Sequence, residues 1–247
     1  MTFLKINFYY IYKFIFKDYK YTLYKMYISL GNNCTVTLSL NNLGLKKESM
    51  PFDYIVSNPR IIYDCFKTNF THFTNINTKH SEYRDNNLVY FYPKIKSSFP
   101  GFPMHSLENE YGIKFHHFGE SPVQLSEMFK RRAERFLNIL EKSNEEIIFF
   151  YCTETYIYDN ISRNNSELDY QYLQKIDNYL SNNYKNLKFK IVNFTINKNI
   201  ENSNHLENIY INVPEEHFSD NCETHKVEVF QPFRKNIQEK IKNYINI

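Results

Sequence analysis

The chain alternates short apolar runs with longer segments in which apolar positions recur every three or four residues. The short runs are typical of strands; they lie at residues 26–30, 146–152, 189–194 and 209–213. The longer segments are typical of amphipathic helices; they lie at residues 34–43, 59–69, 122–142, 167–183 and 231–245. This order predicts an α/β fold, a single domain with a mostly parallel central sheet flanked by helices.

Residues that favour helix ends stand at the predicted boundaries. Gly44 follows the first helical segment, where a left-handed C-terminal cap belongs. Asn58-Pro59 and Ser121-Pro122 precede two later helices, with a capping side chain followed by proline at the first helical position.

The pattern divides the chain into an extension and one domain. Residues 1–24 are aromatic and basic, and we expect a helix there that lies on the domain or on a membrane surface; a true start at Met26 is the alternative. Residues 25–247 form the α/β domain, with a loop-rich insertion at about 70–110 that holds one strand candidate at 88–92. No uncharged run approaches the roughly 18 residues of a membrane span, so we expect no transmembrane segment.

Composition narrows the function only slightly. The net charge of +3 is small and the lysines are scattered, which argues against a nucleic-acid partner. The abundance of Asn, Lys and Ile indicates an AT-rich genome, so the 22 Phe and 22 Tyr are not evidence of base stacking. The four cysteines are far apart and form no C-x-x-C pair, which favours a reducing, intracellular location; they are Cys34, Cys65, Cys152 and Cys222.

Cys34 is the strongest candidate for chemistry. The sequence Ser-Leu-Gly-Asn-Asn-Cys at 29–34 joins the first strand to the first helix, which puts the cysteine at a helix start. Unpaired N–H groups and the helix dipole favour a thiolate there. In open parallel sheets, catalytic groups also collect at the carboxyl ends of strands. Cys34 is therefore either a nucleophile or a small apolar residue at the junction.

A cysteine nucleophile needs a base, and His116 and His117 are the first candidates. They end an alternating segment that starts at Ile113, in which His117 continues the inward face; alternatively, both are surface histidines. Asn32 and Asn33 either donate to an oxyanion or tolerate a strained turn.

Asp53, in Pro51-Phe52-Asp53-Tyr54, is a candidate third member that orients the histidine. The alternative is an Asx-turn or a cap on the following helix.

Two weaker groups remain. His217, Cys222 and His225 lack a fourth ligand at zinc spacing, so we expect no metal and no cofactor, but His217 or His225 is a rival base in a late loop. The cluster on the long helix either forms a solvated face or binds a phosphate or carboxylate; it consists of Arg131, Arg132 and Arg135.

These motifs together resemble the DUF1796 family, labelled putative papain-like cysteine peptidase, which is found in bacteria and large DNA viruses. The resemblance spans about residues 26–155 and rests on S-L-G-N-N-C at 29–34, L-N-N-L-G-L at 40–45, P-F-D-Y at 51–54, Y-G-I-K-F-H-H at 111–117 and R-R-A-E-R-F at 131–136. It implies Cys34 as nucleophile, His116 or His117 as base and Asp53 as third member. It also implies a papain-like α+β fold as the alternative architecture, and a host-cell location if the chain is viral.

Three functions follow from these patterns. The first is a cysteine-dependent hydrolase or acyltransferase acting on a peptide or another acyl substrate. The second is a non-catalytic module in which the turn at 31–34 binds an anionic ligand. The third is an α/β transferase whose arginines on the long helix face a phosphorylated donor.

Overall fold

The computed structural model describes residues 25–31, 34–55, 57–77, 108–109, 111, 113, 115, 121–153, 166–196, 199–212 and 227–246. The predicted extension at 1–24 and the strand candidate at 88–92 lie outside these ranges.

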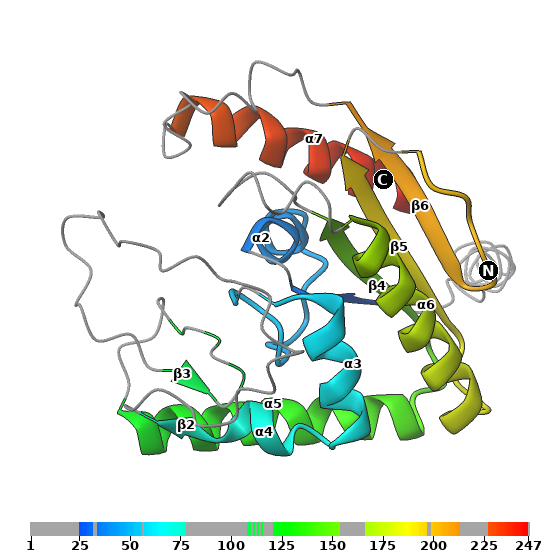
Figure 1. Cartoon of the computed structure of the whole chain (residues 1–247). Helices are drawn as coiled ribbons and strands as arrows, with labels where there is room; N and C mark the ends of the chain where they lie inside the picture. The colour runs from blue at the N-terminus through cyan, green and yellow to red at the C-terminus, as the bar shows by residue number, and fades with distance from the viewer. Residues whose placement is uncertain are drawn as a thin grey trace, which may run out of the picture.

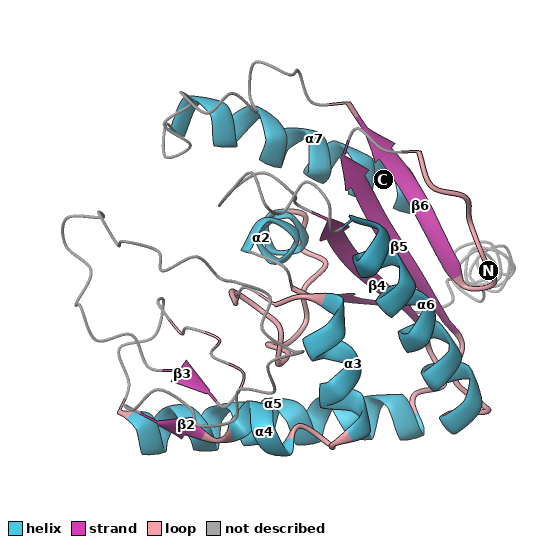
Figure 2. Ribbon diagram, viewed as in Figure 1, coloured by secondary structure: helices cyan, strands magenta, loops and turns pink. Residues whose placement is uncertain are grey.

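A four-stranded parallel sheet forms the centre of the fold (Figure 1). Its strands are β1 (Lys25–Ser29), β4 (Glu146–Thr153), β5 (Phe189–Ile196) and β6 (Leu206–Ile211), in the order β1-β4-β5-β6. All three pairings are parallel. The sheet and the helices that cover both of its faces confirm the predicted α/β class (Figure 2).

Strand β4 shows why its sequence is apolar throughout. Successive side chains of a strand point to opposite faces of the sheet. A strand covered on both faces is therefore apolar at successive positions, without alternating polar residues. Ile147 and Phe149 belong to the core on one face, whereas Ile148 and Phe150 belong to the core on the other. Both cores therefore draw on β4, the strand between β1 and β5.

Helices α2 (Cys34–Asn42) and α7 (Val227–Ile245) pack on one face of the sheet. Val36 and Leu40 of α2 share that core with Phe233, Ile237 and Ile241 of α7, four residues apart along the helix. The two helices also pack against each other. This contact joins the first helix of the described chain to its last.

The other face is covered by α3 (Pro59–Lys67), α5 (Pro122–Lys142) and α6 (Ser166–Asn183). The short α4 (Thr71–Thr74) follows α3. The core on this face of the sheet is rich in aromatic rings. Phe52, from the turn before α3, contacts the rings of Phe70, Phe73 and Phe136 at centroid distances of 5.5–6.1 Å. Phe52 thus anchors its turn in the larger core.

The predicted helix ends are present. Gly44 has φ +68°, and the N–H groups of Gly44 and Leu45 donate to the carbonyl oxygens of Asn41 and Leu40, which closes α2 with a Schellman motif. The Asn58 side chain accepts from Ile61 N, capping α3. Ser121 and Gln124 form a capping box at the start of α5.

The predicted insertion is described only at its ends. Its first residues hold α4 and β2 (Ile76–Asn77), which pairs antiparallel with β3 (Glu108–Asn109). Ile113 and Phe115 are buried, as the alternation predicts, but neither is part of a strand. Helix α5 (Pro122–Lys142) therefore follows two buried residues, Ile113 and Phe115, that belong to no strand.

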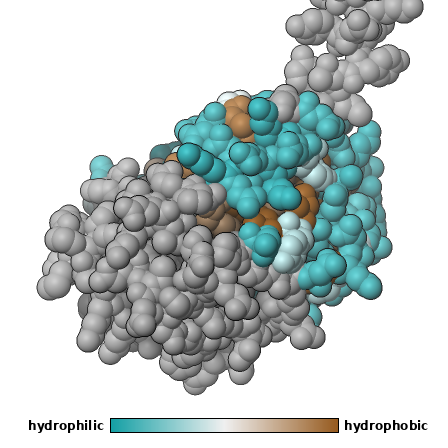
Figure 3. Space-filling model, turned by 90° about the horizontal axis from the view of Figure 1, so that it is seen from above, coloured by the Kyte–Doolittle hydropathy of each residue, from teal (hydrophilic) through white to brown (hydrophobic). Residues whose placement is uncertain are grey.

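Seen from above, the described surface is mostly hydrophilic, with hydrophobic side chains showing near its middle (Figure 3). No helix within the described ranges is both long and apolar enough to cross a membrane.

Candidate active site

A tight turn carries the chain from β1 to Cys34. Gly31 has φ +90°, a conformation that L-residues avoid. A Cβ atom there would clash with Ser57 Oγ and would lie 3.3 Å from Phe52 O. Ser57 Oγ in turn donates to the carbonyl oxygen of Leu30. Glycine is needed at 31 because both its backbone angle and the approach of the 52–57 segment exclude a side chain.

Cys34 is the first residue of α2 and is half-buried. Arg234 of α7 donates from Nη2 to Cys34 Sγ at 3.4 Å. A guanidinium is always charged and has no acceptor, so it favours the thiolate form of a neighbouring cysteine. The helix start favours an anion in the same direction. Two independent positive influences therefore act on this sulfur.

The packing of α7 positions Arg234. Phe233, its neighbour, is buried against α2 together with Ile237. Asn42 Nδ2 at the other end of α2 lies 3.5 Å from Gln238 Oε1. The two helices therefore hold each other along the length of α2, with the guanidinium beside its first residue. Sequence reasoning missed Arg234, because it lies 200 residues from Cys34 in a helix of ordinary amphipathic pattern.

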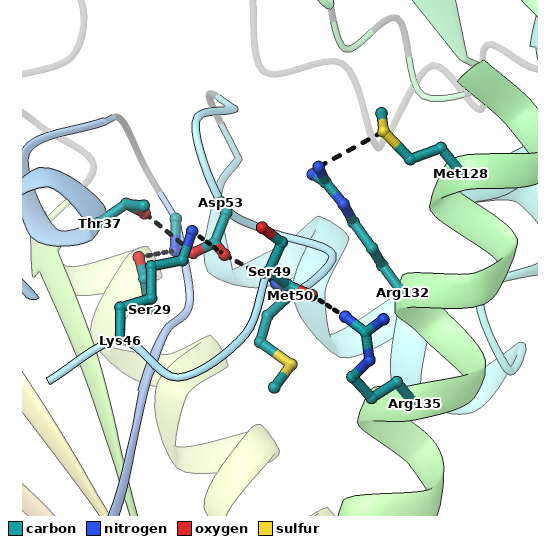
Figure 4. Close-up of polar contacts among 10 residues, drawn as sticks. Ser29, Thr37, Lys46, Ser49, Met50, Asp53, Met128, Arg132 and Arg135 are labelled. Carbon is teal, nitrogen blue, oxygen red and sulfur yellow. Dashed lines mark hydrogen bonds and ion pairs between the residues drawn. The ribbon is translucent and has the colours of Figure 1, made fainter. Parts of the chain in front are cut away.

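Asp53 is buried, accepts two hydrogen bonds and forms one ion pair (Figure 4). Thr37 Oγ1, one turn into α2, donates at 3.1 Å, and Met50 N donates at 2.7 Å. Lys46 Nζ forms an ion pair with its Oδ2 at 2.9 Å. The carboxylate thus ties the turn at 51–54 to the helix that begins with Cys34. These contacts support a positioning role for Asp53.

Lys46 is nearly buried with Asp53, its side chain being 11% exposed. Its ammonium also lies 4.8 Å from the ring centroid of Tyr54. A buried ion pair is stable only when its remaining polar atoms are satisfied, and Thr37 and Met50 supply that here. This polar cluster therefore joins the turn at 51–54 to α2 at Thr37, three residues after Cys34.

The predicted bases fall outside the described residues, as do the predicted oxyanion donors. They are His116, His117, His217, His225, Asn32 and Asn33, and Cys222 also lies outside. Within the described ranges, no group of three or more His, Cys, Asp or Glu side chains could hold a metal ion.

Among the described histidines, His205 has a carboxylate partner, but it lies at the other end of the sheet from Cys34. It directly precedes β6, whereas Cys34 follows β1, so the two stand at opposite ends of parallel strands. Its Nδ1 lies 2.9 Å from Asp177 Oδ1, and its backbone N–H donates to Oδ2 at 3.3 Å. This pair joins α6 to β6.

The side chains of Cys65 and Cys152 are fully buried. Burial raises the pKa of Cys65 well above its ordinary value, and the neighbouring Asp64 carboxylate raises it further. Both therefore serve as internal controls for the reactivity of Cys34, which is half-buried and lies beside a guanidinium.

The three arginines of α5 lie along a concave surface. Arg135 Nε forms an ion pair with Glu48 at 2.9 Å, and its Nη1 donates to Ser49 O at 2.7 Å. Arg132 lies over the ring of Phe129, and Arg131 is exposed.

A family model described as "Putative papain-like cysteine peptidase (DUF1796)" matches residues 25–199, which is more than half of the 247-residue chain. No curated protein and no solved structure matches the chain significantly.

Proposed function

Because the chain belongs to the family described as putative papain-like cysteine peptidases, we propose that it is a cysteine-dependent hydrolase with Cys34 as its nucleophile. The observation that carries this proposal is the contact between Arg234 Nη2 and Cys34 Sγ at the start of α2. This position lies at the carboxyl edge of the sheet, and the guanidinium and the helix start favour the thiolate, which is the nucleophilic form of cysteine.

The chemistry follows from these groups. The thiolate attacks a carbonyl carbon and forms a C–S bond, while backbone N–H groups at the helix start, with Asn32 or Asn33, stabilise the oxyanion. A histidine, protonated when the thiolate forms, gives that proton to the leaving group as its bond to the carbonyl carbon breaks. The neutral histidine then takes a proton from water, which attacks the thioester and releases the Cys34 thiolate. His116 and His117 are the proposed bases, with His217 and His225 as alternatives; Asp53 holds the helix in place, and a contact with the base would make it the third member.

Alkylation followed by mass spectrometry tests the nucleophile. In a brief iodoacetamide treatment at pH 6, Cys34 should be modified before Cys65 and Cys152, which are buried. Arg234→Met should slow this reaction about tenfold, because a hydrogen bond to a charged group contributes about 1.5 kcal/mol. Lys235→Met is the matched control, since it removes an exposed charge from the next position of α7. Uniform slow labelling of all cysteines would contradict the proposal.

Hydrolysis itself needs a second measurement. With p-nitrophenyl acetate, the protein should release a burst of p-nitrophenolate and gain one acetyl group on Cys34, and Cys34→Ala should abolish both. Alanine substitutions of the four candidate histidines, one at a time, then identify the base as the variant that loses turnover.

The same contact favours a second candidate, a non-catalytic module that binds an anion at the helix start. A guanidinium beside a helix N-terminus attracts an anionic ligand as well as a thiolate. In that case phosphate should raise the melting temperature of the protein, Arg234→Met should remove the effect, and neither alkylation preference nor an acetyl burst should be seen.

A further inference from the structure

A cavity of about 360 Å³ lies between α5 and the segment at Glu48–Ser49, separate from the Cys34 turn. Its α5 wall is formed by Met128, Arg131, Arg132 and Arg135, and its other wall by Glu48 and Ser49. On a helix, positions spaced by three, four and seven residues share one face, so these four side chains form one surface. The cavity therefore gathers three guanidinium groups against one carboxylate.

The wall opposite α5 is held before any ligand binds. Arg135 fixes it through Glu48 Oε2 and Ser49 O, at 2.9 and 2.7 Å. The next residue, Met50, is fixed in turn by its N–H bond to the buried Asp53 (Figure 4). Arg135 thus serves the wall, and its charge is the one that Glu48 balances.

Arg132 is positioned by soft partners. Its Nη2 lies 3.5 Å from Met128 Sδ, and its guanidinium carbon lies 4.9 Å from the ring centroid of Phe129. These two contacts orient the guanidinium group along the wall of the cavity. Arg131 adds a second positive charge at the rim of the cavity.

A simple solvated face is a poor account of this arrangement. Arginines on such a face extend into water, whereas Arg132 is half-buried and lies along a walled cavity. Lys130, next to it on α5, shows the ordinary exposed case: it pairs with Glu127 at 2.8 Å and does not line the cavity.

We infer that this cavity is a binding site for a small oxyanion, a phosphate monoester or a carboxylate group, held by the guanidinium groups of Arg132 and Arg131. Planar guanidinium forks match both anions in a bidentate manner. The volume is near the lower end of small-molecule sites, which are about 300–1,000 Å³. The site does not depend on the reactivity of Cys34.

Isothermal titration calorimetry of the full chain at low, constant ionic strength tests the site. The probes are inorganic phosphate for the phosphoryl group and succinate for the carboxylate; the tighter binder identifies the class. Arg132→Met and Arg131→Met should each weaken binding about tenfold, the size of one lost charge-assisted hydrogen bond. Arg132→Lys should recover only part, because the charge remains and the fork is lost.

Two controls separate the site from general charge effects and from the Cys34 turn. Lys130→Gln removes one positive charge from the same helix outside the cavity and should not change binding. Arg234→Met removes the guanidinium at Cys34 and should leave intact the part of the binding that Arg132→Met and Arg131→Met weaken. The inference is overturned if neither anion binds, if Lys130→Gln weakens binding as much as Arg132→Met, or if only Arg234→Met abolishes it. Circular dichroism melts of every variant show whether it is folded.

Discussion

Asp53 and Asp177 are both buried carboxylates, and each accepts a hydrogen bond from a backbone N–H group and contacts a side-chain nitrogen. They lie near opposite ends of the parallel strands. Asp53 lies by the turn that follows β1, with Lys46 as its cation. Asp177 lies by the residue that precedes β6, with His205 as its partner. Similar local chemistry thus occurs at both ends of the sheet.

The cluster near the start of β6, formed by Ser181, Asp177 and His205, has the residue types of a catalytic triad without its geometry. Ser181 Oγ and Asp177 Oδ1 both lie near the same ring nitrogen, His205 Nδ1, at 3.5 and 2.9 Å. A relay requires the nucleophile and the acid on different nitrogens of the ring. Residue types alone therefore do not identify a site; the strand end and the relative directions of the groups do.

The largest expected loss of stability is from Asp53→Ala, which removes the contacts of this carboxylate with Lys46, Thr37 and Met50. It leaves the nearly buried Lys46 ammonium without its carboxylate, and we expect about 4 kcal/mol less stability in denaturant unfolding at pH 7. The double change Asp53→Ala with Lys46→Met should recover part of the loss, since no buried charge is left unpaired. A loss below about 1 kcal/mol would contradict the assigned contacts.

Gly31→Ala should cost about 3 kcal/mol, from a left-handed backbone and the contact with Ser57. Gly44→Ala is the matched control: its φ is also positive, but no atom lies within 4 Å of the added Cβ. That variant should cost only about 1 kcal/mol. Equal losses in the two variants would show that crowding at Gly31 contributes nothing. Unfolding in urea measures both.

Asp177→Ala should cost about 2 kcal/mol, because the N–H and the ring of His205 lose their acceptor. Its rate of Cys34 alkylation should equal that of the unchanged protein, whereas Asp53→Ala should change that rate by loosening α2. If Asp177→Ala alters the reactivity of Cys34 as strongly as Asp53→Ala does, the two ends of the sheet are not independent.

The smallest effect at neutral pH concerns Tyr244, whose hydroxyl lies 3.2 Å from Glu207 Oε2 near the start of β6. Burial, with the Glu207 charge, raises the pKa of Tyr244 above its ordinary value of about 10, and burial also raises the pKa of Tyr27. The folded state therefore keeps these protons when the unfolded chain loses them. Stability from this source is full below pH 10 and declines as pH rises above it.

Tyr244→Phe tests this alkaline dependence. At pH 7 it should cost about 0.5 kcal/mol, for one partly exposed hydrogen bond. Between pH 9 and pH 11 the variant should lose less stability than the unchanged protein, as measured by urea unfolding at each pH. An identical decline in both proteins would mean that Tyr244 does not contribute.

Local patterns predicted most of the regular structure because their causes are local. The continuous apolar run of β4 and the caps at Asn58 and Ser121 each depend on residues a few positions apart. The last strand was predicted at 209–213 and lies at Leu206–Ile211, since its first residues include Glu207 and Asn208, which carry no apolar signal. Pairing with β5, from Ile191 to Leu206 onward, sets where that strand begins.

The α/β order, the helix ends and the place of Cys34 at a helix start could be predicted from the sequence, because periodicity, capping and chain direction act over a few residues. Tertiary structure alone decided that Arg234 lies beside the sulfur, that Asp53 is bound to Thr37 and Lys46, and that the α5 arginines line a cavity. Those contacts join segments far apart in the chain, and only the packing of buried faces fixes their distances.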